Sequence, residues 1–134
     1  MKRLWTTGYR AYELGVFDEK NPKVAVIKDV LQKQLRYQLD STSEDFWLIT
    51  GPQMGVERWS IESALTIKVD YPQLKIALME PYADFAAHWN ENNQARLAAI
   101  KAQVDFAGRV SEKKYESPEQ LRAYQNFMLH YTDG

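Results

Sequence analysis

Apolar positions along this chain alternate between short continuous runs and helical repeats. The runs at residues 46–50 (FWLIT) and 74–79 (LKIALM) are apolar on both faces, which is typical of buried parallel strands. Apolar residues recur at three- and four-residue spacing in the segments that follow Pro22 and Val56. This alternation of strands and helices predicts right-handed βαβ units and a mainly parallel sheet.

Four further segments complete the predicted order of elements. Residues 2–7 form a short first strand, and a helix covers about residues 94–104. A short fourth strand is expected over 106–110 (FAGRV). The sequence SPEQ indicates the start of a last helix, with Ser117 as N-cap and Pro118 at the first helical position.

The expected architecture is a Rossmann-like α/β sandwich of three layers, with residues 1–134 as a single domain. Such folds bind ligands beyond the carboxyl ends of the strands, where the strand order reverses. Those ends fall here at residues 7–10, 50–57 and 80–82. The chain stops after a helix, where the alternation would next supply a strand, and this predicts a shortened version of a longer domain.

Composition narrows the classes of function. Of 134 residues, 45% are hydrophobic and 26% charged, which is typical of a globular domain. The net charge of −1 supplies no basic face for nucleic acid, and the lack of cysteine excludes disulfides, thiolate catalysis and cysteine zinc sites. The N-terminal MKRLWTTGYR has no long apolar stretch, so we expect neither a signal peptide nor a membrane span, and a cytoplasmic protein.

The turn GPQMGVE is the strongest candidate site. Gly51 and Gly55 allow a tight turn and a close approach to a ligand, while free amides at the following helix start favour an anion. Glu57 could accept bonds from ribose hydroxyls or act as a general base. Alternatively, the glycines make an ordinary turn and Glu57 only complements the helix dipole, worth roughly 0.3–1 kcal/mol. The motif is neither a Walker loop nor a GxGxxG fingerprint.

The loop after the first strand, which begins with TGYR, offers a second candidate. Arg10 could place its guanidinium on a phosphate, or it is a solvated loop arginine. Tyr9, Tyr12 and Phe17 could form one wall of a base-stacking pocket, or they pin a long loop onto the core.

Neither histidine is placed in the sequence as part of a metal-binding motif. His88 has no second ligand residue nearby, and His130 stands alone on a helix, so both are interpreted as non-ligands. Neither a Ser–His–Asp set nor a nucleophile elbow can be assembled from the motifs. Trp89 either stacks on a base or fills the edge of the core.

Together, these segments resemble the YpsA-type proteins of the SLOG superfamily, which also includes the Lonely Guy phosphoribohydrolases and the DNA-processing protein DprA. The resemblance runs in order along the whole chain, with similar spacing. It rests on TGYR (7–10), ELGVF (13–17), ITGPQMGVERW (49–59), LKIALMEPY (74–82), Trp89, YESPEQL (115–121) and QNFMLHYTDG (125–134).

The resemblance implies a Rossmann-like domain that binds a nucleotide or a nucleotide-derived ligand, such as NAD or ADP-ribose, as a sensor or regulatory module. It also implies a link to cell division and envelope growth in Gram-positive bacteria, and hence a protein partner there. The family's ligand contacts fall on Gly8, Arg10, Gly55 and Glu57. With the strand-end argument, the expected ligand-binding residues are Gly8, Arg10, Gly51, Gly55, Glu57, Pro81, Tyr82 and Trp89.

Departures from the related families leave two alternatives. The Lonely Guy signature PGGxGTxxE is only GPQMGVE here, so a nucleotide N-glycosidase or phosphoribohydrolase with Glu57 as its catalytic residue is the alternative reading. DprA-like binding of single-stranded DNA is a second, and the net charge weighs against it.

The end of the chain departs from the family as well. Residues 125–134 resemble a family segment, N…SDG, that normally runs into another buried strand, so the resemblance implies that the C-terminal part is lacking. His130 stands where an acidic residue is expected. An unpaired sheet edge would favour association into a homo-oligomer.

Overall fold

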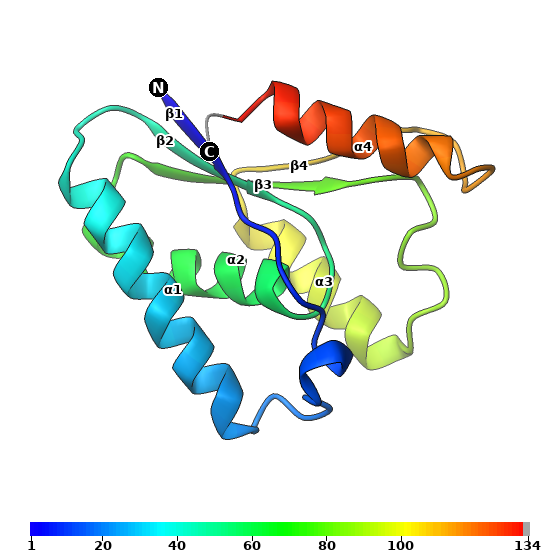
Figure 1. Ribbon diagram of the computed structural model, residues 1–134, viewed down its shortest axis with the longest axis horizontal. Helices are drawn as coiled ribbons and strands as arrows, with labels where there is room; N and C mark the ends of the chain where they lie inside the picture. Colours follow the sequence, from blue (N-terminus) through cyan, green and yellow to red (C-terminus); the bar gives the residue numbers. More distant parts are fainter. Residues whose placement is uncertain (133–134) are drawn as a thin grey trace.

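The computed structural model describes residues 1–132, which form a parallel sheet of four strands with helices between them (Figure 1). The strands are β1 (Lys2–Trp5), β2 (Phe46–Thr50), β3 (Leu74–Glu80) and β4 (Phe106–Arg109), and the helices are α1 (Pro22–Asp40), α2 (Val56–Ile67), α3 (Glu91–Gln103) and α4 (Glu119–His130). Short 3-10 turns lie at η1 (Tyr12–Leu14) and η2 (Lys68–Asp70). The last two residues of the family-like segment 125–134 lie outside the described part.

Helices α1, α2 and α3 cover one face of the sheet, and α4 lies on the other (Figure 1). This arrangement confirms the predicted three-layer α/β fold with parallel strands. The strands follow the order β1-β2-β3-β4, so their order does not reverse within residues 1–132. Each right-handed crossover steps in the same direction, and this keeps the first three helices on a single face.

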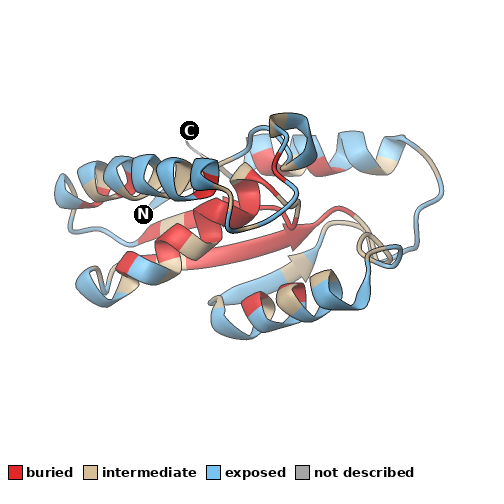
Figure 2. Ribbon diagram, turned by 90° about the horizontal axis from the view of Figure 1, so that it is seen from below, coloured by how far each residue is buried: buried red, intermediate tan, exposed pale blue. Residues whose placement is uncertain are grey.

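The larger core lies between the sheet and α1–α3. Alternate residues of β2 and β3, such as Leu48 and Ile76, point into this core and are fully buried. Helix α2 sits against the central strands and is buried on most sides, whereas α1, α3 and α4 show buried residues mainly as a stripe (Figure 2). Burying one such aliphatic side chain stabilises the fold by roughly 1.5–3 kcal/mol.

The opposite face of the sheet packs on α4. Its residues Ile49, Ala77 and Met79 form a second cluster with Tyr124 and Met128 of the helix. Leu121 and Leu129, which the sequence pattern places near the same face, are exposed. Helix α4 is therefore held by a narrow apolar stripe.

Several predicted boundaries shift for local reasons. Helix α3 begins at Glu91 and not near residue 94, because the Asn90 side chain caps it by accepting the Asn93 N–H at 2.8 Å. Ser117 is not the N-cap of α4. Pro118 takes that position, and the Gln120 side chain accepts the Ser117 N–H at 3.2 Å.

Strand β1 ends earlier than predicted, at Trp5 and not at residue 7. Helix α2 ends at Ile67, where the tighter turn η2 continues the chain. Within residues 1–132, no helix combines the length and apolar character needed to cross a membrane.

Candidate functional site

The two loops that the sequence analysis selected lie against each other. The loop after β1 and the turn after β2 meet in an isolated antiparallel bridge between Arg10 and Gly55. The Val56 N–H donates to the Tyr9 carbonyl at 3.1 Å, so a free amide at the start of α2 is used by the protein itself. The loop and the turn therefore form one structural unit at the carboxyl edge of the sheet.

Gly55 has a structural reason to be glycine. It precedes α2 with φ of 131°, a conformation that side chains rarely adopt. A Cβ at this position would lie 2.5 Å from the Tyr9 carbonyl oxygen. The glycine thus permits the loop after β1 to dock on the turn.

Glu57 lies in the first turn of α2 and is only 6% exposed. One carboxylate oxygen accepts the Gln53 N–H at 3.2 Å, and the Thr7 side chain also hydrogen-bonds to the carboxylate. Burial raises the pKa of Glu57 from 4.5 to about 7, against the opposing effects of these hydrogen bonds and of Arg10. The carboxyl group therefore exchanges its proton near neutral pH.

Tyr124 brings α4 into the same site. A Cβ at Gly51 would lie 2.5 Å from the Tyr124 hydroxyl and 2.9 Å from the carboxylate oxygen of Glu57. The missing side chain at Gly51 therefore lets the hydroxyl and the carboxylate come together. Burial and the neighbouring Glu57 both raise the pKa of Tyr124, so the phenol keeps its proton.

These groups border a cavity of about 350 Å³, called here the carboxylate pocket. It lies where loops from the ends of β1, β2 and β3 meet the first turns of α4. Its lining residues are Trp5, Thr7, Gly8, Arg10, Pro52, Gln53, Glu57, Pro81, Phe85, Leu121, Tyr124 and Gln125.

A second cavity, of about 640 Å³ and called here the aromatic pocket, adjoins the first. Arg10 and Gln53 line both cavities. Each volume lies within the range of small-molecule sites. The remaining residues of the aromatic pocket are Ala11, Tyr12, Val16, Phe17, Asp18, Glu19, Met54, Trp89, Asn93 and Arg96.

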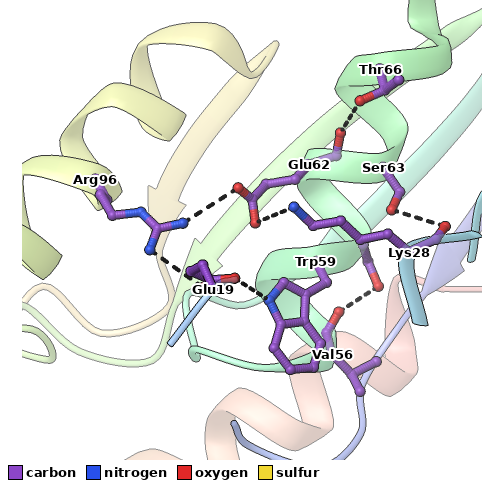
Figure 3. A network of polar contacts seen from close by, with 9 residues as sticks. Glu19, Lys28, Val56, Trp59, Glu62, Ser63, Thr66 and Arg96 are labelled. Atoms are coloured by element: carbon purple, nitrogen blue, oxygen red, sulfur yellow. Dashed lines mark hydrogen bonds and ion pairs between the residues drawn. The ribbon is translucent and has the colours of Figure 1, made fainter. Parts of the chain in front are cut away.

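A network of polar contacts fixes the walls of the aromatic pocket (Figure 3). Arg96 of α3 donates to Glu19 at 3.3 Å and pairs with Glu62 of α2 at 3.6 Å. The Trp59 indole N–H donates to Glu19 at 3.1 Å, and Lys28 of α1 pairs with Glu62. Arg96 is thus neutralised by two carboxylates that also hold α3 against α2.

Arg10 differs from Arg96 in its surroundings. It is exposed, and its guanidinium donates to the Tyr12 hydroxyl at 3.0 Å. Among residues 1–132 it forms no ion pair with a carboxylate. Its charge is therefore available to an anion at the junction of the two pockets.

The segment 81–89 forms a wall common to both pockets. Pro81 and Phe85 line the carboxylate pocket and Trp89 lines the aromatic pocket, with the rings of Phe85 and Trp89 edge to face at 5.9 Å. Arg58 lies over the Trp89 ring at 5.4 Å. Trp89 therefore packs on the edge of the core and also borders a cavity, and its stacking on a base stays a prediction.

The structure brings most of the expected site residues together. Gly8, Arg10, Glu57 and Pro81 line the carboxylate pocket, while Gly51 and Gly55 shape the backbone around it. Tyr82 lines neither pocket, because its ring packs on Phe85 at 5.4 Å and on Tyr115 at 5.1 Å.

The aromatic residues of the loop after β1 separate in the structure. Tyr12 and Phe17 line the aromatic pocket, whereas Tyr9 lines neither cavity. All three are exposed, so they do not pin the loop to the core; the buried Val16 does so by packing near Trp59.

Sequence reasoning missed Thr7, Gln53, Phe85 and Tyr124 as residues of the site. The helical spacing placed Tyr124 on the buried face of the last helix, where an aromatic residue is ordinarily part of the core. A tyrosine in place of phenylalanine on that face was the one available signal, since a buried phenol needs a partner.

Over residues 1–132, no group of three or more His, Asp or Glu side chains is placed to hold a metal ion. His88 and His130 are both exposed.

Known proteins are similar to this chain over nearly its whole length. The sequence profile YpsA, described as the YspA SLOG family, matches residues 4–134. A "UPF0398 protein" of Limosilactobacillus reuteri is 59% identical over 133 residues, which are 99% of this chain and 70% of the relative. Proteins of the same name from Latilactobacillus sakei and Lactiplantibacillus plantarum are 56% and 50% identical over 134 residues, all of this chain and 71% and 70% of theirs.

Proposed function

The chain belongs to the YspA SLOG family, and from this premise we propose that its two adjoining pockets bind one nucleotide or nucleotide-derived ligand of the NAD or ADP-ribose type. The ribose would lie in the carboxylate pocket near Glu57, and the base between the aromatic side chains of the second pocket. The bound state would be passed to a protein partner, which makes the domain a sensor or regulatory module.

The observation that carries this proposal is the position of Arg10. This cation borders both cavities, with a buried carboxyl group on one side and an aromatic-lined cavity on the other. A phosphate at Arg10 would receive charge-assisted hydrogen bonds and would orient the two ends of a nucleotide into the two pockets.

The proposal is tested by thermal-shift and calorimetric titration with ADP-ribose and NAD. A ligand at 100 times its dissociation constant stabilises the folded state by about 2.7 kcal/mol. Glu57→Ala should weaken binding while the domain stays folded, and Glu91→Ala, a first-turn glutamate on α3, is the matched control. Equal affinities in wild type and Glu57→Ala would show that Glu57 is only a helix-terminus charge.

A second function, hydrolysis of a nucleotide N-glycosidic bond, is favoured by one observation. A carboxyl group whose pKa is about 7 can give and accept a proton at neutral pH, as general acid–base catalysis requires. Incubation with AMP, followed by detection of free adenine and ribose 5-phosphate, tests it. Saturable binding of AMP without release of adenine would support the binding module and exclude this hydrolase for AMP.

A further inference from the structure

Two polar atoms at the carboxylate pocket have no hydrogen-bond partner among the described residues. They are the hydroxyl oxygen of Tyr124 and the indole nitrogen of Trp5. Both side chains line the pocket, and Tyr124 is 9% exposed. A buried donor without an acceptor destabilises the folded state, and no described residue offsets this for either group.

The two donors come from elements far apart in the sequence. Trp5, the last residue of β1, packs against the same apolar cluster as Tyr124 of α4. Beside Tyr124, Glu57 supplies an acceptor whose Oε1 and the Tyr124 hydroxyl both lie within 3 Å of the Cβ position of Gly51. Two unsatisfied donors and one carboxylate therefore border one small space.

Of the three groups, only Glu57 already has protein partners. Its carboxylate accepts bonds from the Gln53 N–H and the Thr7 side chain, which fix its position. The Tyr124 and Trp5 groups are donors that require oxygen acceptors. The missing group must therefore accept from Tyr124 and Trp5, and a hydroxyl group that does so can also donate to Glu57.

We propose that Tyr124, Trp5 and Glu57 together bind the vicinal hydroxyls of a sugar. Tyr124 is the residue through which α4 contacts the ligand. This inference rests on the proposed nucleotide binding and names the part of the ligand that enters the carboxylate pocket. A hydroxyl group is both donor and acceptor, so two neighbouring hydroxyls satisfy the two donors and the carboxylate at once. The negative charge of a phosphate would be repelled by the carboxylate of Glu57, so we place the phosphate of the ligand at Arg10.

The test combines one substitution in the protein with the removal of one hydroxyl group from the ligand, and compares the binding affinities of all combinations. Wild type and Tyr124→Phe are titrated calorimetrically with AMP, 2′-deoxy-AMP and 3′-deoxy-AMP. Loss of one hydrogen bond predicts that Tyr124→Phe binds AMP about 3- to 10-fold more weakly. The same variant should show no further loss with the deoxy ligand that lacks the contacted hydroxyl.

The stability of the Tyr124→Phe variant shows whether the Tyr124 hydroxyl contacts the ligand or only supports the fold. Because the Tyr124 hydroxyl has no protein partner, Tyr124→Phe should unfold at the same urea concentration as wild type or higher. Tyr131→Phe, the same change at a residue outside both pockets, is the matched control and should leave AMP affinity unchanged. Equal AMP affinity of Tyr124→Phe and wild type, or equal losses with all three ligands, would overturn the inference.

Failure of the proposed nucleotide binding gives a different result from failure of the sugar site. If wild type binds none of AMP, ADP-ribose and NAD, the nucleotide proposal fails, and D-ribose 5-phosphate then tests the sugar site alone. Binding of this sugar phosphate that weakens in Tyr124→Phe would support the sugar site without a nucleotide. Absence of its binding to wild type would overturn the inference as well.

Discussion

Arg10 and Gly55 face each other in an antiparallel bridge, so the loop after β1 and the turn after β2 form one unit. This pairing places the guanidinium of Arg10 at the junction of both pockets. It also makes the backbone of the turn sensitive to any side chain at Gly55.

Gly55→Ala should destabilise the protein by more than about 3 kcal/mol. The φ of 131° costs an alanine roughly 1–3 kcal/mol, and the overlap with the Tyr9 carbonyl oxygen adds to this. Gly15→Ala is the matched control, since Gly15 has φ of 70° but no atom within 4 Å of a Cβ. Its cost should stay at about 1–2 kcal/mol. Urea unfolding measures both variants, and similar losses would contradict the docking role of Gly55.

Glu57 should make the protein less stable as the pH rises. Its pKa is raised on folding, so its contribution is fully present below pH 4.5 and is lost as the pH rises through about 7. The attraction of Arg10 and the hydrogen bonds from Gln53 and Thr7 already oppose this rise, and the neighbouring Tyr124 stays neutral. The difference amounts to about 3 kcal/mol between pH 4 and pH 8.

Glu57→Gln removes this titration and tests its sign. The variant should lose less stability than wild type between pH 4 and pH 8 when urea unfolding is measured at both values. Glu116→Gln, at an exposed position, should follow the wild-type curve. A wild-type pH dependence that persists in Glu57→Gln would assign the effect to another group.

Arg10→Gln should weaken the binding of ADP-ribose about 10-fold or more. A hydrogen bond to a charged group contributes roughly 1.5–3 kcal/mol, and the variant removes the positive charge at the junction of the pockets. Calorimetry at two salt concentrations should also show a smaller salt dependence for the variant. Arg36→Gln, on α1 beside Asp70, is the control and should bind like wild type. Unchanged affinity in Arg10→Gln would place the phosphate elsewhere.

Arg58→Met should stabilise the fold by about 1–3 kcal/mol, the cost of leaving a buried donor unpaired. Arg58 is 1% exposed, and both of its terminal nitrogens lack a hydrogen-bond partner among residues 1–132. Burial lowers the pKa of Arg58, and nearby Arg96 lowers it further. Urea unfolding measures the change, with Arg36→Met, at a half-buried position beside Asp70, as the control. A loss of stability would show that the attraction of Glu62 and Glu19, together with the contact on the Trp89 ring, outweighs the cost of burial.

The sequence alone determined the order of the elements and the edge of the sheet that carries the site. The apolar runs at 46–50 and 74–79 are typical of strands buried on both faces of a covered parallel sheet, and the structure confirms both strands. Parallel strands put their carboxyl ends at one edge, which is why the loops with Arg10 and Glu57 could be selected together.

Tertiary structure decided which side chains meet at that edge. Sequence periodicity reports which face of an element is apolar, but it does not say which distant element covers that face. The docking of α4 on the sheet brings Tyr124 beside Glu57, and aromatic packing turns Tyr82 away from the pocket. The contacts that define the site are thus long-range, and they depend on the path of the crossovers and not on local spacing.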